Sequence, residues 1–199
     1  MIDYDNGYDM PLFVDKIPTL AITACSGNID WVKFLLNLGF KVDEVQVETN
    51  RNAFFSAVRV SDVKMIRFLL ENGANPNHKD IKGDCVFGYL IGIHPKFEEK
   101  LQCEILELIL DYGFDIKQNF RGSPLLQTAI YYGKLDIAKI LIKRGSNLWG
   151  VATLAYKYGF DSLVEIIQKK QIEELSKKTA LQIAISIPLE TQIQLLVIP

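Results

Sequence analysis

Residues 61–73 read S-D-V-K-M-I-R-F-L-L-E-N-G, and this stretch decides the fold. Its apolar positions, from Met65 to Leu70, recur at the three- and four-residue spacing of one helix face. Gly73 follows directly, at the place where a left-handed residue ends many helices. The stretch therefore predicts an amphipathic helix that ends at a glycine.

The same pattern returns along the chain at nearly regular intervals. The glycines that close the long apolar segments are Gly39, Gly73, Gly113 and Gly145, and a shorter apolar segment precedes each long one. A motif that recurs at a period of about 33 residues predicts an array of stacked units, each too small to bury its own apolar face. The similar long segments are 27–39, 103–113, 133–145 and 159–168, and the short ones are 18–24, 52–58, 85–91, 123–130, 151–156 and 179–185.

A short helix, a tight turn, a longer helix and a glycine at this period resemble the ankyrin repeat. The resemblance covers about residues 17–185 and implies an all-α ankyrin-repeat solenoid, with β-hairpin or loop fingers between the helix pairs. The residues that match the motif are Pro18, Leu20, Gly27, Ala57, Gly73, Ala74, Asn75, Asn77, Gly83, Ser123, Pro124, Leu125, Ala129, Gly133 and Gly159.

The repeats divide the chain into expected segments. We expect five degenerate repeats at about 17–50, 51–84, 85–122, 123–150 and 151–175. Residues 1–16 are acidic with interleaved aromatics, and they form either a cap on the first repeat or an arm that touches a partner. Residues 176–199 start a sixth unit that Pro188 interrupts. Their apolar end either closes the array or forms a dimer contact.

Several local features carry expectations of their own. Trp31 and Phe34 should lie on the inward stripe of the first long helix. Ser61 stands where glycine is usual, and Asp62 is well placed to cap the next helix. Residues 92–102 form an insertion, either a surface loop or added helix, and surface loops often carry function. The connection before residue 151 should be a simple turn.

Composition excludes several classes of protein. An apolar fraction of 49% is ample for a core, and a net charge of −2 gives no bulk attraction to nucleic acid or anionic membrane. No run of eighteen apolar residues or signal-peptide pattern occurs. Three spaced cysteines, an odd number, indicate reduced thiols. We therefore expect a cytoplasmic monomer, or one delivered into a host cytosol, without contacts to nucleic acid or membrane.

Catalytic chemistry finds little support in the residues. Cys85 lies close to His78 in the sequence, but no third residue to orient the pair is evident. No zinc-ligand spacing and no nucleotide-binding glycine loop occurs. The basic cluster at Lys134, Lys139, Lys143 and Arg144 is typical of a solvated helix face. We expect no enzyme, cofactor or metal; the alternative is an enzyme centred near the 92–102 insertion.

The family resemblance implies a protein partner, bound on the concave face that the short helices and fingertips form. Tyrosine is enriched at interface hot spots, which favours the exposed turn positions of this face, although ordinary packing would also explain tyrosines there. The degenerate repeats suggest a bacterial or viral effector or a toxin-neutralising immunity protein. The candidate binding residues are Arg59, Lys79, Asp80, Lys82, Phe120, Arg121, Tyr131, Tyr132, Lys157 and Tyr158.

Overall fold

The computed structural model describes residues 20–91 and 98–186, with side chains as far as residue 179. The chain forms two compact units, residues 1–146 and 147–199. The expected N-terminal segment 1–16, Pro18, His94 and the apolar tail after residue 186 lie outside the described residues.

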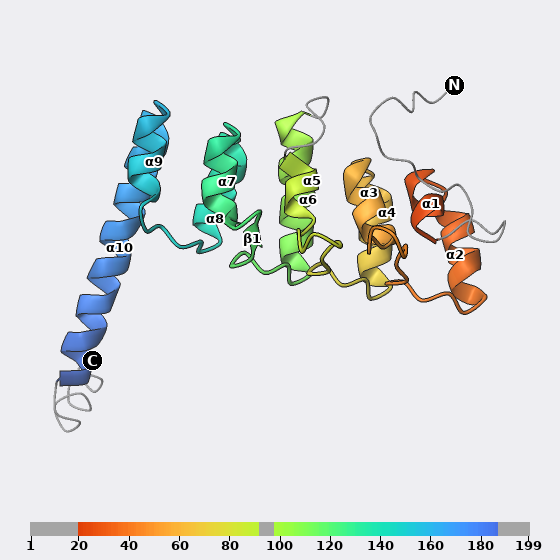
Figure 1. Cartoon of the computed structure of the whole chain (residues 1–199). Helices are drawn as coiled ribbons and strands as arrows, with labels where there is room; N and C mark the ends of the chain where they lie inside the picture. The colour runs from red at the N-terminus through yellow and green to blue at the C-terminus, as the bar shows by residue number, and fades with distance from the viewer. Residues whose placement is uncertain (1–19, 92–97, 187–199) are drawn as a thin grey trace. The chain divides into compact units, whose positions relative to one another are not determined.

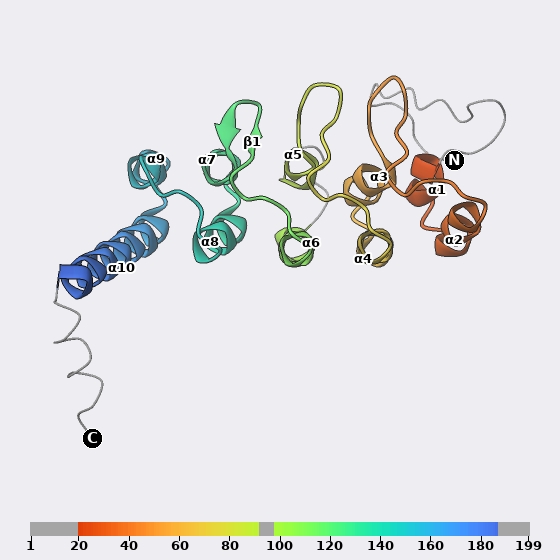
Figure 2. The same cartoon turned by 90° about the horizontal axis from the view of Figure 1, so that it is seen from below.

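The described residues of the first unit form an array of four helix pairs, so the predicted all-α fold is confirmed. The first helices of the pairs lie in one row and the second helices in another (Figures 1 and 2). The pairs are α1 (Leu20–Cys25) with α2 (Ile29–Asn37), α3 (Ala53–Arg59) with α4 (Val63–Glu71), α5 (Phe87–Ile91) with α6 (Glu99–Asp111), and α7 (Leu125–Tyr131) with α8 (Leu135–Lys143).

Three connections project beyond the row of first helices, as Figure 2 shows. We call them finger 1 (residues 38–52), finger 2 (72–86) and finger 3 (112–124). Finger 3 contains the antiparallel strands β1 (Asn119–Phe120) and β2 (Ser123–Pro124). Finger 2 closes with a single bridge between Lys79 and Cys85. The predicted hairpin or loop fingers are therefore present.

Short polar side chains cap the N-termini of two of the second helices. Others form hydrogen bonds between the bases of neighbouring fingers. Asn28 and Asp62 cap α2 and α4, and the positive φ of 55° at Ser61 matches the place where glycine is usual. Asp43 of finger 1 accepts a hydrogen bond from the Asn75 backbone of finger 2 at 3.1 Å, and Asn77 accepts one from the Asp115 backbone of finger 3 at 2.8 Å. Each finger is thus tied to the next.

The core lies between successive helix pairs. The position eight places before each closing glycine is occupied by Met65 in α4, Ile105 in α6 and Ile137 in α8, and all three are 0% exposed. Helices α4 and α6 contact each other, as do α6 and α8, and α1, α3 and α5 form a parallel series of contacts. Burial of this recurring position between neighbouring pairs contributes to the stability of the array.

The expectation for Trp31 and Phe34 is wrong. Trp31 is 54% exposed and Phe34 is 49% exposed, and their rings meet edge to face at 5.4 Å. Trp31 stands eight places before Gly39, at the position that Met65 occupies in the next repeat. The inward stripe of α2 is instead Val32 and Leu35. The side of α2 that a preceding repeat would cover is therefore the side on which these two rings lie.

The insertion at 92–102 contributes partly to a helix. Helix α6 begins at Glu99 and has 13 residues, whereas α2, α4 and α8 have 9 each. Gln102 in its first turn is buried, and its side-chain amide donates to the Leu90 carbonyl at 2.8 Å. The added turn thus packs against the end of α5; residues 92–97 are not described.

The second unit holds one helix pair, α9 (Val151–Lys157) and α10 (Asp161–Ser186). The short connection predicted ahead of α9 is confirmed, since α8 ends at Lys143 and α9 begins at Val151. The expected start of a separate unit at residue 176 is wrong, because α10 runs through it. No glycine or proline occurs between residues 161 and 186, so nothing breaks the helix there.

A pair of equivalent substitutions tests the role of the buried position. We expect Met65→Ala to lower the free energy of unfolding by about 2–5 kcal/mol, because it leaves a cavity between α4 and its neighbours. Trp31→Ala should cost less, although it removes more atoms, because half of that side chain is already in water. Urea titration followed by circular dichroism measures both, and an equal or larger loss at Trp31 would contradict this assignment.

Candidate functional site

The fingers and the first helices form one continuous surface of the first unit, which we call the finger face (Figure 2). Most of the candidate residues lie on it: Arg59 ends α3, Lys79, Asp80 and Lys82 lie in finger 2, Phe120 and Arg121 in finger 3, and Tyr131 and Tyr132 at the end of α7. Lys157 and Tyr158 belong to the second unit and are described separately.

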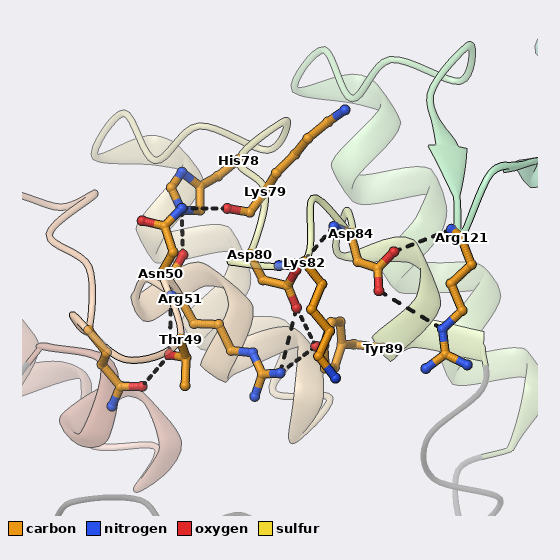
Figure 3. A network of polar contacts seen from close by, with 11 residues as sticks. Thr49, Asn50, Arg51, His78, Lys79, Asp80, Lys82, Asp84, Tyr89 and Arg121 are labelled. Atoms are coloured by element: carbon orange, nitrogen blue, oxygen red, sulfur yellow. Dashed lines mark hydrogen bonds and ion pairs between the residues drawn. The ribbon is translucent and has the colours of Figure 1, made fainter.

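A buried carboxylate organises the tip of finger 2. Asp80 is 4% exposed and accepts hydrogen bonds from the Tyr89 hydroxyl at 2.7 Å and from the backbone N–H of Lys82 at 2.8 Å and Asp84 at 3.0 Å. Arg51 of finger 1 lies 3.6 Å from it and also donates to the Tyr89 hydroxyl. Figure 3 shows this cluster between the two fingers. Asp80 is therefore a structural anchor, and its predicted place on a binding surface is wrong.

Fingers 1 and 2 are joined by further hydrogen bonds beside this cluster (Figure 3). The Asn50 side-chain amide donates to the Lys79 carbonyl at 2.8 Å, and His78 Nε2 lies 2.7 Å from the Asn50 carbonyl oxygen. The Ile81 backbone N–H donates to the Thr49 carbonyl at 3.0 Å. These bonds hold the two tips in a fixed relation, and they give His78 a structural partner.

Phe120 is also wrong as an exposed tip residue. It is 4% exposed, and its ring fills the space beside Gly88 of α5, where a Cβ would lie 1.9 Å from the ring. Glycine at position 88 therefore makes the site for this ring. Arg121 lies over the Phe120 ring at 5.1 Å and pairs with Asp84 of finger 2, with Nε 3.9 Å from Oδ2.

The remaining candidates on the finger face are accessible. Lys79, Lys82 and Arg121 are exposed, Tyr131 is 64% exposed, and Tyr131 and Tyr132 meet edge to face at 5.3 Å. Arg59 is half-buried, and its guanidinium lies 3.2 Å from the Cys25 sulfur of the preceding pair. The structure thus places aromatic and cationic side chains on one surface.

The second unit has exposed candidates of its own. Lys157 and Tyr158, at the end of α9, are both exposed, and the Tyr158 ring stacks on Phe160 at 6.3 Å. Trp149 and Tyr156 are more exposed still, and sequence reasoning did not select them. Trp149 belongs to the connection between α8 and α9. This connection is short, so it has few residues that could cover the indole ring.

Cys85 and Cys103 lack the surroundings of a nucleophile. Cys85 is buried, its thiol donates to the Asn119 carbonyl at 3.8 Å, and burial raises the pKa of this thiol. Burial first, then the neighbouring carboxylates of Glu99, Asp136 and Glu107, raises the pKa of Cys103 to about 11. Within the described ranges, no group of three His, Cys, Asp or Glu side chains could hold a metal ion, and no helix is long and apolar enough to cross a membrane.

The role of Asp80 in the buried cluster could have been predicted from the sequence. Asp80 precedes a glycine turn, K-G-D at 82–84, and aspartate commonly accepts from backbone N–H groups two residues ahead. Its partners Arg51 and Tyr89 come from finger 1 and from α5, and nothing in their local sequence marks them as partners.

The comparisons with known proteins agree with this architecture. The family model described as ankyrin repeats (3 copies) matches residues 4–80. Residues 4–80 of the chain are thus similar to the ankyrin repeat family. Ankyrin repeats are protein–protein interaction modules, generally without catalytic activity of their own.

Similar proteins come from viruses and a bacterium. The ankyrin repeat domain-containing protein OPG015 of Monkeypox virus is 28% identical over 131 residues, covering 64% of this chain and 29% of that protein. The putative ankyrin repeat protein L86 of Acanthamoeba polyphaga mimivirus is 28% identical over 100 residues (43% and 17%). Phosphocholine transferase AnkX of Legionella pneumophila is 25% identical over 122 residues (61% and 13%). The matches thus cover less than a third of each of these relatives.

Removing the buried carboxylate should loosen the ankyrin fingers. We expect Asp80→Ala to lower the free energy of unfolding by about 2–4 kcal/mol, because Arg51 and the Tyr89 hydroxyl lose a buried partner. Glu48→Ala, an exposed carboxylate on finger 1, is the matched control and should change it by less than about 0.5 kcal/mol. Equal effects of the two substitutions in urea titrations would refute the anchoring role.

The thiols provide a second measurement. In the folded protein at pH 8, we expect iodoacetamide to modify Cys103 more slowly than a cysteine in the urea-unfolded chain, because its raised pKa leaves little thiolate. The rate should keep rising as the pH approaches about 11. Buried Cys85 should react only after unfolding. Mass spectrometry of tryptic peptides follows each site, and rapid modification of Cys85 in the folded chain would contradict its burial.

Proposed function

We propose that this chain is a non-catalytic module that binds a protein partner through the finger face of its first unit. The observation that carries the proposal is the adjacent pair Tyr131 and Tyr132 at the exposed end of α7. Tyrosine offers a large, amphipathic contact surface and is common at binding hot spots. Two such rings in contact on one helix end form a compact anchor.

Rigidity of the same surface supports the proposal. The fingers are joined by the Asp80 cluster, by the bonds between Asn50 and finger 2, and by the Arg121–Asp84 pair. A partner that docks on preordered groups loses less conformational entropy than one that must order them. Surface loops with this many fixed contacts are well suited to recognition.

The biological setting is the finer part of the proposal. We favour an effector that engages a host protein, because the relatives include ankyrin proteins of two viruses and a Legionella protein. A toxin-neutralising immunity protein would use the same binding activity. A toxin reading frame next to the gene would favour that role.

The enzyme alternative has weaker support. It places a catalytic centre near the 92–102 insertion, where Gln102 is used to hold α5. The nearby thiol of Cys85 is buried and hydrogen-bonded, and one relative, a phosphocholine transferase by name, matches over only 13% of its length. A reaction that is lost in Cys85→Ala or His94→Ala, with the fold intact, would revive this alternative.

The tyrosine pair provides the test. We expect Tyr131→Ala combined with Tyr132→Ala to weaken partner binding by at least tenfold, because each anchor residue typically contributes about 2 kcal/mol or more, about thirtyfold in affinity. The immobilised full chain captures partners from host lysate, and titration then measures affinity for the purified partner. A Lys64→Ala, Arg67→Ala variant on exposed positions of α4 is the control. Equal affinity of the tyrosine variant and the control would overturn the proposed surface.

A further inference from the structure

Fingers 2 and 3 carry a cation at the same position. Lys82 follows Ile81 and precedes Gly83, and Arg121 follows Phe120 and precedes Gly122. Both glycines have positive φ, 76° and 79°, so a glycine turn follows the cation in each finger. In Figure 3 the side chains of Lys82 and Arg121, one from each of two successive fingers, extend in a similar direction, whereas Lys79 extends in another. We call Lys82 and Arg121 the cation row.

The carboxylates of this region lie beneath the row. Asp80 and Asp84 are buried and already accept hydrogen bonds or pair with Arg51 and Arg121. Lys82 has no ion pair to any described residue. The exposed carboxylates near the tips are Glu48 on finger 1 and Asp115 at the base of finger 3. The outer surface of fingers 2 and 3 is therefore mainly cationic.

Spacing suggests the shape of a matching ligand. Packed helices lie about 8–10 Å apart, so cations on successive repeats recur at about that interval. A peptide in the polyproline II conformation has three residues per turn and rises about 3.1 Å per residue. Side chains three residues apart on such a peptide point the same way and are about 9 Å apart. Acidic residues at every third position would therefore match the row.

We propose that the cation row of Lys82 and Arg121 binds an extended acidic segment of the protein partner, with a carboxylate at about every third residue. Arg121 is held over the Phe120 ring and against Asp84, so its position is set before binding. Lys82 supplies a cation with no competing ion pair within the described chain. This inference rests on the proposed function and names the class of partner.

Charge favours a protein segment over nucleic acid. The whole chain carries a formal charge of −2, so a long polyanion gains no general attraction to it. Ile81, 65% exposed, lies next to Lys82 and gives the same surface an apolar contact that a phosphate backbone would not use. A polyanion remains a distinct outcome of the test.

The test uses the full chain and a defined probe. The probe is a fluorescein-labelled peptide with four Glu-Pro-Pro repeats, and the same peptide with Gln in place of Glu is its neutral control. Fluorescence anisotropy should show binding of the acidic peptide that weakens as salt rises, and at least tenfold weaker binding of the neutral peptide. Equal affinity for the two peptides would overturn the proposal.

Charge reversal on the protein locates the site. Lys82→Glu, alone and with Arg121→Glu, should weaken binding of the acidic peptide at least tenfold. Lys64→Glu is the control: it makes the same charge change at an exposed position of α4, outside the finger face, and it should alter affinity less than twofold. Circular dichroism and melting curves check folding, and the single Lys82 variant keeps the Asp84 pair intact.

The remaining outcomes are also decisive. A similar loss for Lys64→Glu, or tighter binding of a twelve-nucleotide oligothymidine than of the peptide, would replace this proposal with non-specific or nucleic-acid binding. Partner capture that depends on Tyr131 and Tyr132, combined with no peptide binding, would refute the acidic segment and leave the proposed function standing. Peptide binding at Lys82 with capture unaffected by the tyrosines would refute the tyrosine anchor alone.

Discussion

The architecture depends on one recurring burial. In the second, third and fourth pairs, the long helix buries the residue eight positions before its closing glycine, and Met65, Ile105 and Ile137 are fully buried there. A single helix cannot bury this side chain, because side chains project outward from the helix axis. A helix such as α4, with about two and a half turns, therefore needs a neighbouring helix to cover it. The helix pairs therefore have to stack, and stacking in turn sets the spacing at which the fingers repeat.

The fingers depend on a second arrangement, in which the carboxylates of Asp80 and Asp84 are buried. Asp80 binds backbone N–H groups and a tyrosine hydroxyl, so its charge is used to fix the turn. Arg121 is held by an aromatic ring and by Asp84. The same interactions that give the tips a definite shape also leave their positive groups facing outward. Stability and the surface available for recognition are thus linked through the same few side chains.

Much of the fold could be predicted from the sequence, because the repeat appears as a periodic apolar pattern and as glycines with positive φ. The capping by Asp62 and the turn at Ser61 followed from local chemistry. Phe120 could not be placed that way, since its burial depends on Gly88, which lies far back along the chain in α5 and leaves room for the ring. Trp31 was misplaced because periodicity identifies a helix face but does not say whether a neighbour covers it. The length of α10 was not predicted, because the apolar segment at 179–185 resembles the short first helix of a repeat. In the structure this segment is the last part of α10.

The exposed rings on α2 have a consequence for how such a molecule can change in size. In a closed barrel the number of strands is fixed by closure, but here each pair needs only its immediate neighbours. Trp31 and Phe34 form an exposed apolar surface on the first described pair, and an apolar surface of this kind is what a further helix pair would need for stacking. Gain or loss of whole units at this end would leave the packing of α4, α6 and α8 untouched. The molecule can therefore evolve, or be engineered, in steps of one repeat.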